Sequence, residues 1–140
     1  MKNTSNPKAM KITQQLLDSL TEQAKASPRL RMNHDLRNSD KDQSQRMLNA
    51  IEPGTHVPVH RHPKTSETII ILRGHATEVF FDVTGRVVEE TVDLKPGGEC
   101  VAINVPMGKW HTIHPLESGT VILEMKEGAY EPMREEDMME

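Results

Sequence analysis

The chain has 140 residues, with 17 Lys and Arg against 21 Asp and Glu, so its formal net charge is -4. This length fits one domain with a core of its own. The mildly acidic balance argues against a general nucleic-acid partner, which would require a basic face. Residues 1–11 lack the apolar segment of a secretory signal and the longest aliphatic run is 69–72, so we expect a cytoplasmic protein without a membrane partner.

One helix is predicted near the N-terminus, after a disordered lead-in over residues 1–10. Apolar side chains recur three to four residues apart over 12–26, which is typical of an amphipathic helix. Thr13 is placed to cap this helix. Pro28 is expected to end it, because the residue before a proline is pushed out of the helical region.

From residue 45 onward the chain is predicted to form short strands separated by turn signals such as Pro53-Gly54 and Pro96-Gly97-Gly98. The predicted strands are 45–51, 56–62, 67–73, 76–82, 86–93, 99–104, 110–115 and 120–126. Short strands at such regular spacing indicate an all-β sandwich or barrel. We expect a single domain over 11–130 and an acidic, flexible tail over 131–140.

One of these strands is apolar on both faces. Ile69 and Ile71 share the parity of Glu67, whereas Ile70 and Leu72 face the other way. A strand of this kind must be covered on both sides. The barrel interior is expected to cover one face, and either the helix or a partner subunit in a homodimer is expected to cover the other.

Three histidines and a glutamate have the spacing of a metal site. His60 and His62 are two residues apart on a predicted strand, so their side chains share a face, with Cα atoms about 6.6 Å apart. Glu67 follows a turn at Pro63, and a hairpin would bring it back beside them. His111 opens a later strand that could complete the set. Three imidazoles and one carboxylate suit a single divalent zinc, iron, nickel, manganese or copper ion and leave coordination positions open.

These segments resemble the two motifs of the cupin superfamily. The first motif is matched at every step by Gly54, His60, His62, Glu67 and Gly74. The second is matched by Pro106, Gly108 and His111, whereas Gly98 lies two residues too early and Pro115 replaces the terminal Asn. The resemblance implies a cupin jelly-roll barrel, or double-stranded β-helix, preceded here by a short N-terminal α-helix.

A closer resemblance is to the WbuC family of bacterial cupin-fold metalloproteins, from about Lys11 to Pro132. It rests on the leading helix and on Ser27-Pro-Arg29-x-Arg31-x-Asn33, Arg46-Met47, Pro53-Gly54-Thr55, His60-Arg-His62-Pro, Trp110-His111 and Glu124-Met-Lys126-x-Gly128-x-Tyr130-x-Pro132. The acidic, Met-rich end departs from the family. The resemblance implies bacterial surface polysaccharide biosynthesis, with a sugar or nucleotide-sugar as substrate.

The reaction stays open at this point, and no catalytic residue is assigned. A metal-dependent isomerase or epimerase is one reading and an oxygenase is another, because an open metal can polarise a carbonyl or activate water or dioxygen. A non-catalytic module that binds or senses a small molecule through its metal is the alternative function. A closed four-ligand zinc of purely structural role is a third possibility.

Several cationic or polar side chains are expected to line the mouth of the barrel and to bind a ligand. They are Arg29, Arg31, Arg46, Arg73 and His56. The planar guanidinium group suits carboxylate and phosphate, so these residues predict a small anionic ligand. A solvated edge or a subunit contact is the alternative role for the arginines.

Overall fold

The computed structural model describes residues 6–139. The single long helix, α1, spans Gln14–Ala26 and confirms the predicted helix. The Thr13 hydroxyl accepts a hydrogen bond from the backbone N–H of Leu16 at 3.1 Å and caps its N-terminus. Ser27 adopts an extended conformation before Pro28 and ends the helix. Within the described residues, no helix is long and apolar enough to span a bilayer.

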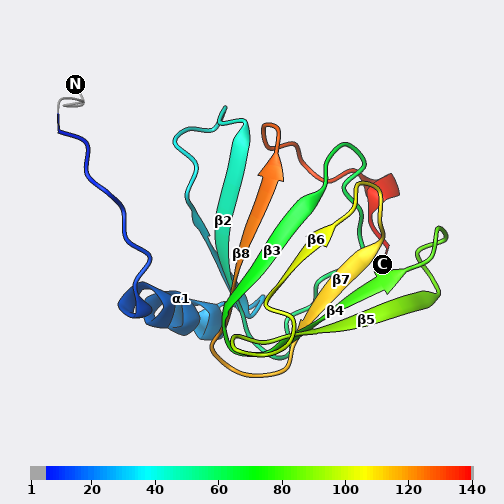
Figure 1. The fold of residues 1–140 in the computed structure, drawn as a ribbon, viewed down its shortest axis with the longest axis horizontal. Helices are drawn as coiled ribbons and strands as arrows, with labels where there is room; N and C mark the ends of the chain where they lie inside the picture. Colours follow the sequence, from blue (N-terminus) through cyan, green and yellow to red (C-terminus); the bar gives the residue numbers. More distant parts are fainter. Residues whose placement is uncertain (1–5, 140) are drawn as a thin grey trace.

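Eight strands form two antiparallel sheets that face each other like the sides of an open barrel (Figure 1). The strands are β1 Arg31–Asp35, β2 Ser44–Ile51, β3 Glu67–Arg73, β4 Ala76–Phe81, β5 Val88–Leu94, β6 Ala102–Val105, β7 His111–Pro115 and β8 Thr120–Glu127. One sheet has the order β1-β2-β8-β3-β6 and the other the order β5-β4-β7. This arrangement confirms the expected all-β jelly roll with a short N-terminal helix.

Two apolar clusters hold the layers together. The inner cluster lies between the sheets and consists of Ile51, Ile69, Ile71, Ala76, Phe80, Leu94, Val105, Ile113 and Ile122. The outer cluster packs α1 on the far side of the larger sheet and consists of Leu17, Leu20, Ala24, Leu48, Ala50 and Val121, with Leu72 against it. The helix therefore covers the outward face of β3 at Leu72. From the sequence, this helix and a partner subunit are the two alternatives for that face.

The strand predicted at 56–62 does not form. The segment between β2 and β3 is extended but irregular, and only His60 makes isolated bridges, one to His111 and one to Met138. Pro58 lies in the middle of this segment and has no N–H to donate to a neighbouring strand. The prediction of a strand here is wrong because Pro58 interrupts the backbone pairing that the alternation of side chains indicates.

A β-bulge moves Arg73 to the outer face of its sheet. The pairing of β3 with β8 shifts between Ile71 and Arg73, so the parity that begins at Glu67 is broken there. The Arg73 guanidinium then forms an ion pair with Asp18 of α1 at 2.7 Å and hydrogen-bonds Gln14. The expectation that Arg73 lines the mouth of the barrel is therefore wrong.

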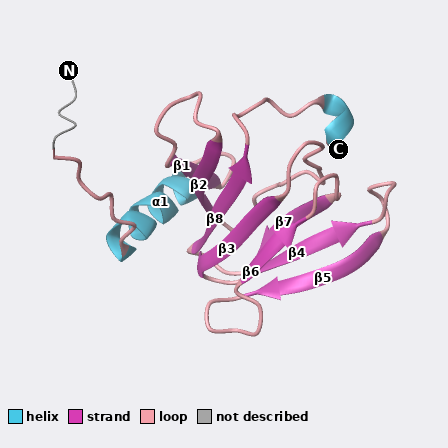
Figure 2. Ribbon diagram, turned by 45° about the horizontal axis from the view of Figure 1, so that its top comes forward, coloured by secondary structure: helices cyan, strands magenta, loops and turns pink. Residues whose placement is uncertain are grey.

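The C-terminal segment, predicted from the sequence to be an acidic flexible tail, lies against the barrel in this structure. The chain leaves β8 and crosses to a short 3₁₀ turn, η1, at Glu135–Asp137 (Figure 2). Asp137 is buried and accepts a hydrogen bond from Nε of Arg61 at 2.8 Å. The Met139 N–H donates to the carbonyl of Val59 at 2.7 Å. At the other end of the chain, part of the predicted lead-in, residues 1–5, lies outside the described residues.

Candidate metal centre

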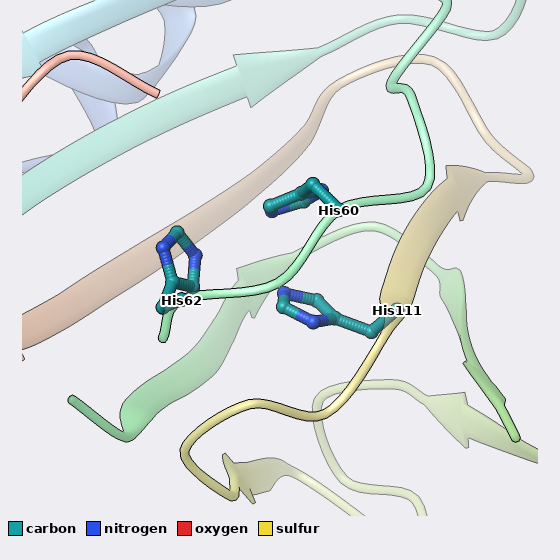
Figure 3. A group of neighbouring side chains, drawn as sticks. All are labelled: His60, His62 and His111. Atoms are coloured by element: carbon teal, nitrogen blue, oxygen red, sulfur yellow. The ribbon is translucent and has the colours of Figure 1, made fainter. Parts of the chain in front are cut away.

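Two segments that are distant in sequence bring three histidines together. His60 and His62 lie on the irregular segment before β3, and His111 is the first residue of β7. Reciprocal backbone hydrogen bonds of 3.0 and 2.8 Å join His60 to His111. The three rings converge on one space (Figure 3), and one nitrogen from each lies within 4.8 Å of the others.

Backbone carbonyl groups fix the tautomers of two of these histidines. Nδ1 of His60 lies 2.8 Å from the Pro58 carbonyl oxygen, and Nδ1 of His111 lies 2.8 Å from the Lys109 carbonyl oxygen. A carbonyl only accepts hydrogen bonds, so each Nδ1 must carry the proton. Each Nε2 is then left with a free lone pair, which is the form that binds a metal.

Glu67 completes the group from the first position of β3. Its carboxylate oxygens lie 3.6 Å from Nε2 of His62 and 3.4 Å from Nε2 of His111, and its side chain is 5% exposed. Both of these Nε2 atoms are buried and have no hydrogen-bond partner within residues 6–139. Buried polar atoms without partners are rare in folded proteins. A metal ion held by the three imidazoles and Glu67 would satisfy them, so the donor set fits such an ion.

The electrostatic environment keeps the group in a state suited to metal binding. Burial lowers the pKa of His60 and of His62 to about 4, so both rings are neutral at pH 7. Burial alone would raise the pKa of Glu67. The nearby His111, His62 and Lys126 outweigh that effect and hold the pKa of Glu67 below its ordinary value. Neutral imidazoles and an ionised carboxylate are the forms that metal ligands require.

The histidines line a cavity of about 230 Å³ between the two sheets. Its polar lining also includes Arg31, Asn49, Glu78, Glu124 and Lys126, and Met133 and Met138 of the C-terminal segment contribute apolar surface to it. A groove of about 900 Å³ lies between the 61–65 loop and residues 126–137, and it shares His62, Lys126 and Met133 with the cavity. A molecule could therefore place one end in the cavity and a larger end in the groove.

Only one of the predicted ligand-binding residues lines the cavity, namely Arg31 of β1. Arg29 is exposed in the turn before β1. Arg46 shares the outward parity of Leu48, hydrogen-bonds the Leu36 carbonyl at 2.9 Å and pairs with Asp42.

His56 is also exposed, because the irregular segment does not keep the strand alternation that placed it inward. Val57 and Pro58 of the same segment line the cavity instead.

Two acidic residues that were not predicted as site residues lie inside the barrel. Glu78 of β4 is fully buried, and burial, with added repulsion from Glu67 and Glu124, raises its pKa to about 9. Burial also raises the pKa of Glu124 of β8 to about 8. An acidic residue in an alternating strand normally indicates the solvent face. The inward parity of Phe80 in β4 and of Ile122 in β8 was the signal that could have found them.

Solved structures similar to this chain are cupin-fold proteins. A cupin 2 domain-containing protein from Halorhodospira halophila matches with a TM-score of 0.58 and 17% identity, over 74% of this chain and 68% of that one. Oxalate decarboxylase from Lactobacillus farciminis has a TM-score of 0.52 and 21% identity, over 63% of this chain. The capsular polysaccharide assembling protein CapF from Staphylococcus aureus has a TM-score of 0.53 and 21% identity, over 66% of this chain.

The chain spans only 25% of the length of each of the last two proteins. Structural similarity at these sequence identities shows that the chain has the cupin fold, and it does not assign an activity. No curated protein sequence matches the chain. Residues 12–93, more than half of the chain, match a family model described as "Domain of unknown function (DUF6016)". The chain therefore belongs to the DUF6016 family and has the cupin fold.

Proposed function

We propose that this protein is a metal-dependent enzyme of the isomerase or epimerase type that acts on a small polar metabolite. The observation that supports this proposal most is the pair of buried Nε2 atoms on His62 and His111, which have no hydrogen-bond partner among the described residues and lie close to Glu67 within one cavity. An ion held there by His60, His62, His111 and Glu67 would act as a Lewis acid toward a carbonyl or hydroxyl group.

The residues of the chain would supply the rest of the chemistry. Pro58 and Lys109 hold two imidazoles in the ligating tautomer through their carbonyl groups. Arg31 and Lys126 line the cavity and carry positive charge that would orient an anionic group. Met133 and Met138 of the C-terminal segment line the cavity, and their apolar side chains would help to displace water around a bound substrate.

A sugar or nucleotide-sugar of bacterial surface polysaccharide biosynthesis is the proposed substrate. The resemblance to the WbuC family supports this choice, and so does the fold shared with a capsular polysaccharide assembling protein. The groove beside the cavity adds room for a larger substituent. We also propose that residues 11–130 form the functional domain and that the protein works in the cytoplasm. We further propose that it is a homodimer, and light scattering would test this oligomeric state.

Turnover of a substrate panel tests the proposal. Protein reconstituted with zinc, manganese, iron or nickel would be incubated with sugars and nucleotide-sugars, and the products followed by NMR spectroscopy. We expect conversion of at least one compound by the wild type and none by His62→Ala. Saturable binding without conversion would favour the non-catalytic binding module, and neither binding nor conversion would reject the proposed substrate class.

A further inference from the structure

Glu78 is a buried acidic residue that the metal centre leaves unexplained. Its side chain has no exposed surface, and neither carboxyl oxygen has a hydrogen-bond partner within residues 6–139. It projects from β4 into the cavity that the three histidines line. An unpartnered buried carboxyl group destabilises a fold considerably. Its retention here points to a ligand that supplies the missing hydrogen bonds.

A second unpartnered atom lies in the same cavity. Oδ1 of Asn49, on β2, is buried and has no partner in the described part of the chain. Glu124 lines the cavity from β8, the strand that pairs with β2. Glu78 comes from the smaller sheet and Asn49 and Glu124 from the larger one, so both sheets contribute to one polar surface.

We propose that Glu78, Asn49 and Glu124 form a hydroxyl-binding wall beside the metal centre and that the cavity selects a small hydroxycarboxylic acid. This inference rests on the proposed function and narrows its small polar metabolite to a hydroxy acid or to a sugar derivative whose acidic end enters the cavity. The ligand hydroxyl groups would hydrogen-bond to the wall. The ligand carboxylate would face Arg31, Lys126 and the metal.

The charges around the cavity suit an anionic ligand. Arg31 and Lys126 are cationic, and a divalent ion would add further positive charge. Among the residues proposed to bind the metal, Glu67 is the acidic one that offsets this charge. Burial raises the pKa of Glu78 and favours the protonated form, in which the carboxyl group donates one hydrogen bond and accepts others. Asn49 Oδ1 can accept a hydrogen bond from a hydroxyl group. An anion that carries hydroxyl groups is complementary to both sets of residues.

The size of the cavity favours a small molecule. A volume of about 230 Å³ is below the usual range for drug-sized ligands, which is roughly 300–1,000 Å³. At about 30 Å³ for each water molecule, it has room for a ligand of several heavy atoms. A short hydroxy acid or the acidic end of a sugar acid would fill it.

Calorimetric titration with glycerate and propionate tests the wall. Both acids have three carbon atoms and one carboxylate, and they differ only in two hydroxyl groups. We expect wild-type protein loaded with zinc to bind glycerate at least about tenfold more tightly than propionate, as one or two buried hydrogen bonds would give. Glu78→Leu should reduce this ratio to within about twofold. Glu78→Gln, which keeps a donor and an acceptor, should retain most of it, and Glu90→Gln on the exposed face of β5 is the matched control.

Equal affinities in the wild type would overturn the inference, as would a ratio that survives in Glu78→Leu or no binding of either acid. Circular dichroism would verify that each variant folds. Metal content, measured on the same samples, tests the proposed function separately. The titrations are repeated on chelator-treated protein. If the wild type binds no zinc, the metal centre is rejected, and the glycerate-to-propionate ratio of the metal-free protein then tests the hydroxyl-binding wall by itself.

Discussion

The imidazole of His111 donates its Nδ1 proton to the backbone carbonyl of Lys109 across 2.8 Å. This bond comes from the turn at Pro106–Gly108, where the Gly108 N–H is held by the His62 carbonyl. The turn of the second motif thereby sets the orientation of its own histidine and contacts the strand-like segment that holds the other two. Backbone groups thus orient the imidazole of His111, which would limit the reorganisation that metal binding requires.

Acid should destabilise the metal-free protein in a defined window. The pKa of His60 and of His62 is about 4 in the folded chain and about 6.5 when unfolded. Between these values the unfolded chain binds more protons, so the free energy of unfolding falls as pH falls from about 6.5 to about 4, by up to about 1.4 kcal/mol per pH unit for each ring. Urea unfolding of chelator-treated wild type and His62→Gln measures this, and the variant should show a shallower slope. Identical slopes would show that His62 is not held neutral by burial.

Glu78 should destabilise the protein more as the pH rises. A carboxyl group whose folded pKa is raised contributes stability that is fully present below its unfolded value near 4.5 and is lost as pH rises through about 9. Glu78→Gln removes this dependence. Relative to the wild type, the chelator-treated variant should therefore gain about 4 kcal/mol between pH 5 and pH 8. Unfolding curves at the two pH values decide this, and an unchanged difference would mean that Glu78 ionises freely.

Gly74, the last residue of the first motif, is required by a close backbone approach. Its φ is 88°, and a Cβ atom there would lie 2.6 Å from Cα of Thr120. Gly97 has a φ of 76° and open space around it. Both Gly→Ala variants incur the left-handed strain of about 1–2 kcal/mol, and Gly74→Ala should lose about 2 kcal/mol more because the backbone must shift. Equal losses in thermal or urea unfolding would show that the contact with Thr120 relaxes without cost.

Asp137 should hold the C-terminal segment over the cavity. Its buried carboxylate pairs with Arg61, whose guanidinium also lies 4.6 Å from the centroid of the Trp110 ring. Asp137→Ala removes this anchor. We expect it to speed the loss of bound zinc to a chelator several-fold and to lower stability by about 1–3 kcal/mol, with exposed Glu135→Ala as control. If the two variants release zinc at the same rate, the segment does not gate the cavity.

The sequence predicted the elements better than the orientation of single side chains. The α1 pattern and seven of the eight predicted strand positions have counterparts in the structure, because hydrophobic periodicity and turn residues act locally. Arg73 was misplaced because a bulge in the pairing of β3 with β8 is set by the partner strand. His56 was misplaced because Pro58 breaks the alternation nearby.

The candidate metal ligands could be identified from the sequence, whereas the residues of the proposed hydroxyl-binding wall could not. His60, His62, Glu67 and His111 belong to motifs with fixed spacing, and the structure brings them together. Glu78 and Glu124 lie in alternating strands where an acidic residue indicates solvent. The inward parity of Phe80 and Ile122 points to their placement, but the polar cavity that accommodates them forms only where the two sheets face each other, which depends on the pairing of strands that are distant in sequence.

Metal content per chain tests the central claim most directly. Purified wild type, His62→Ala, Glu67→Gln and His114→Ala would be analysed by inductively coupled plasma mass spectrometry after equilibration with zinc and removal of the excess. His114 is exposed on β7 and serves as the matched control for the buried His111 on the same strand. The account predicts close to one ion per chain in the wild type and in His114→Ala, with a sharp loss in the other two. No bound metal in the wild type, or equal content in all four proteins, would contradict it.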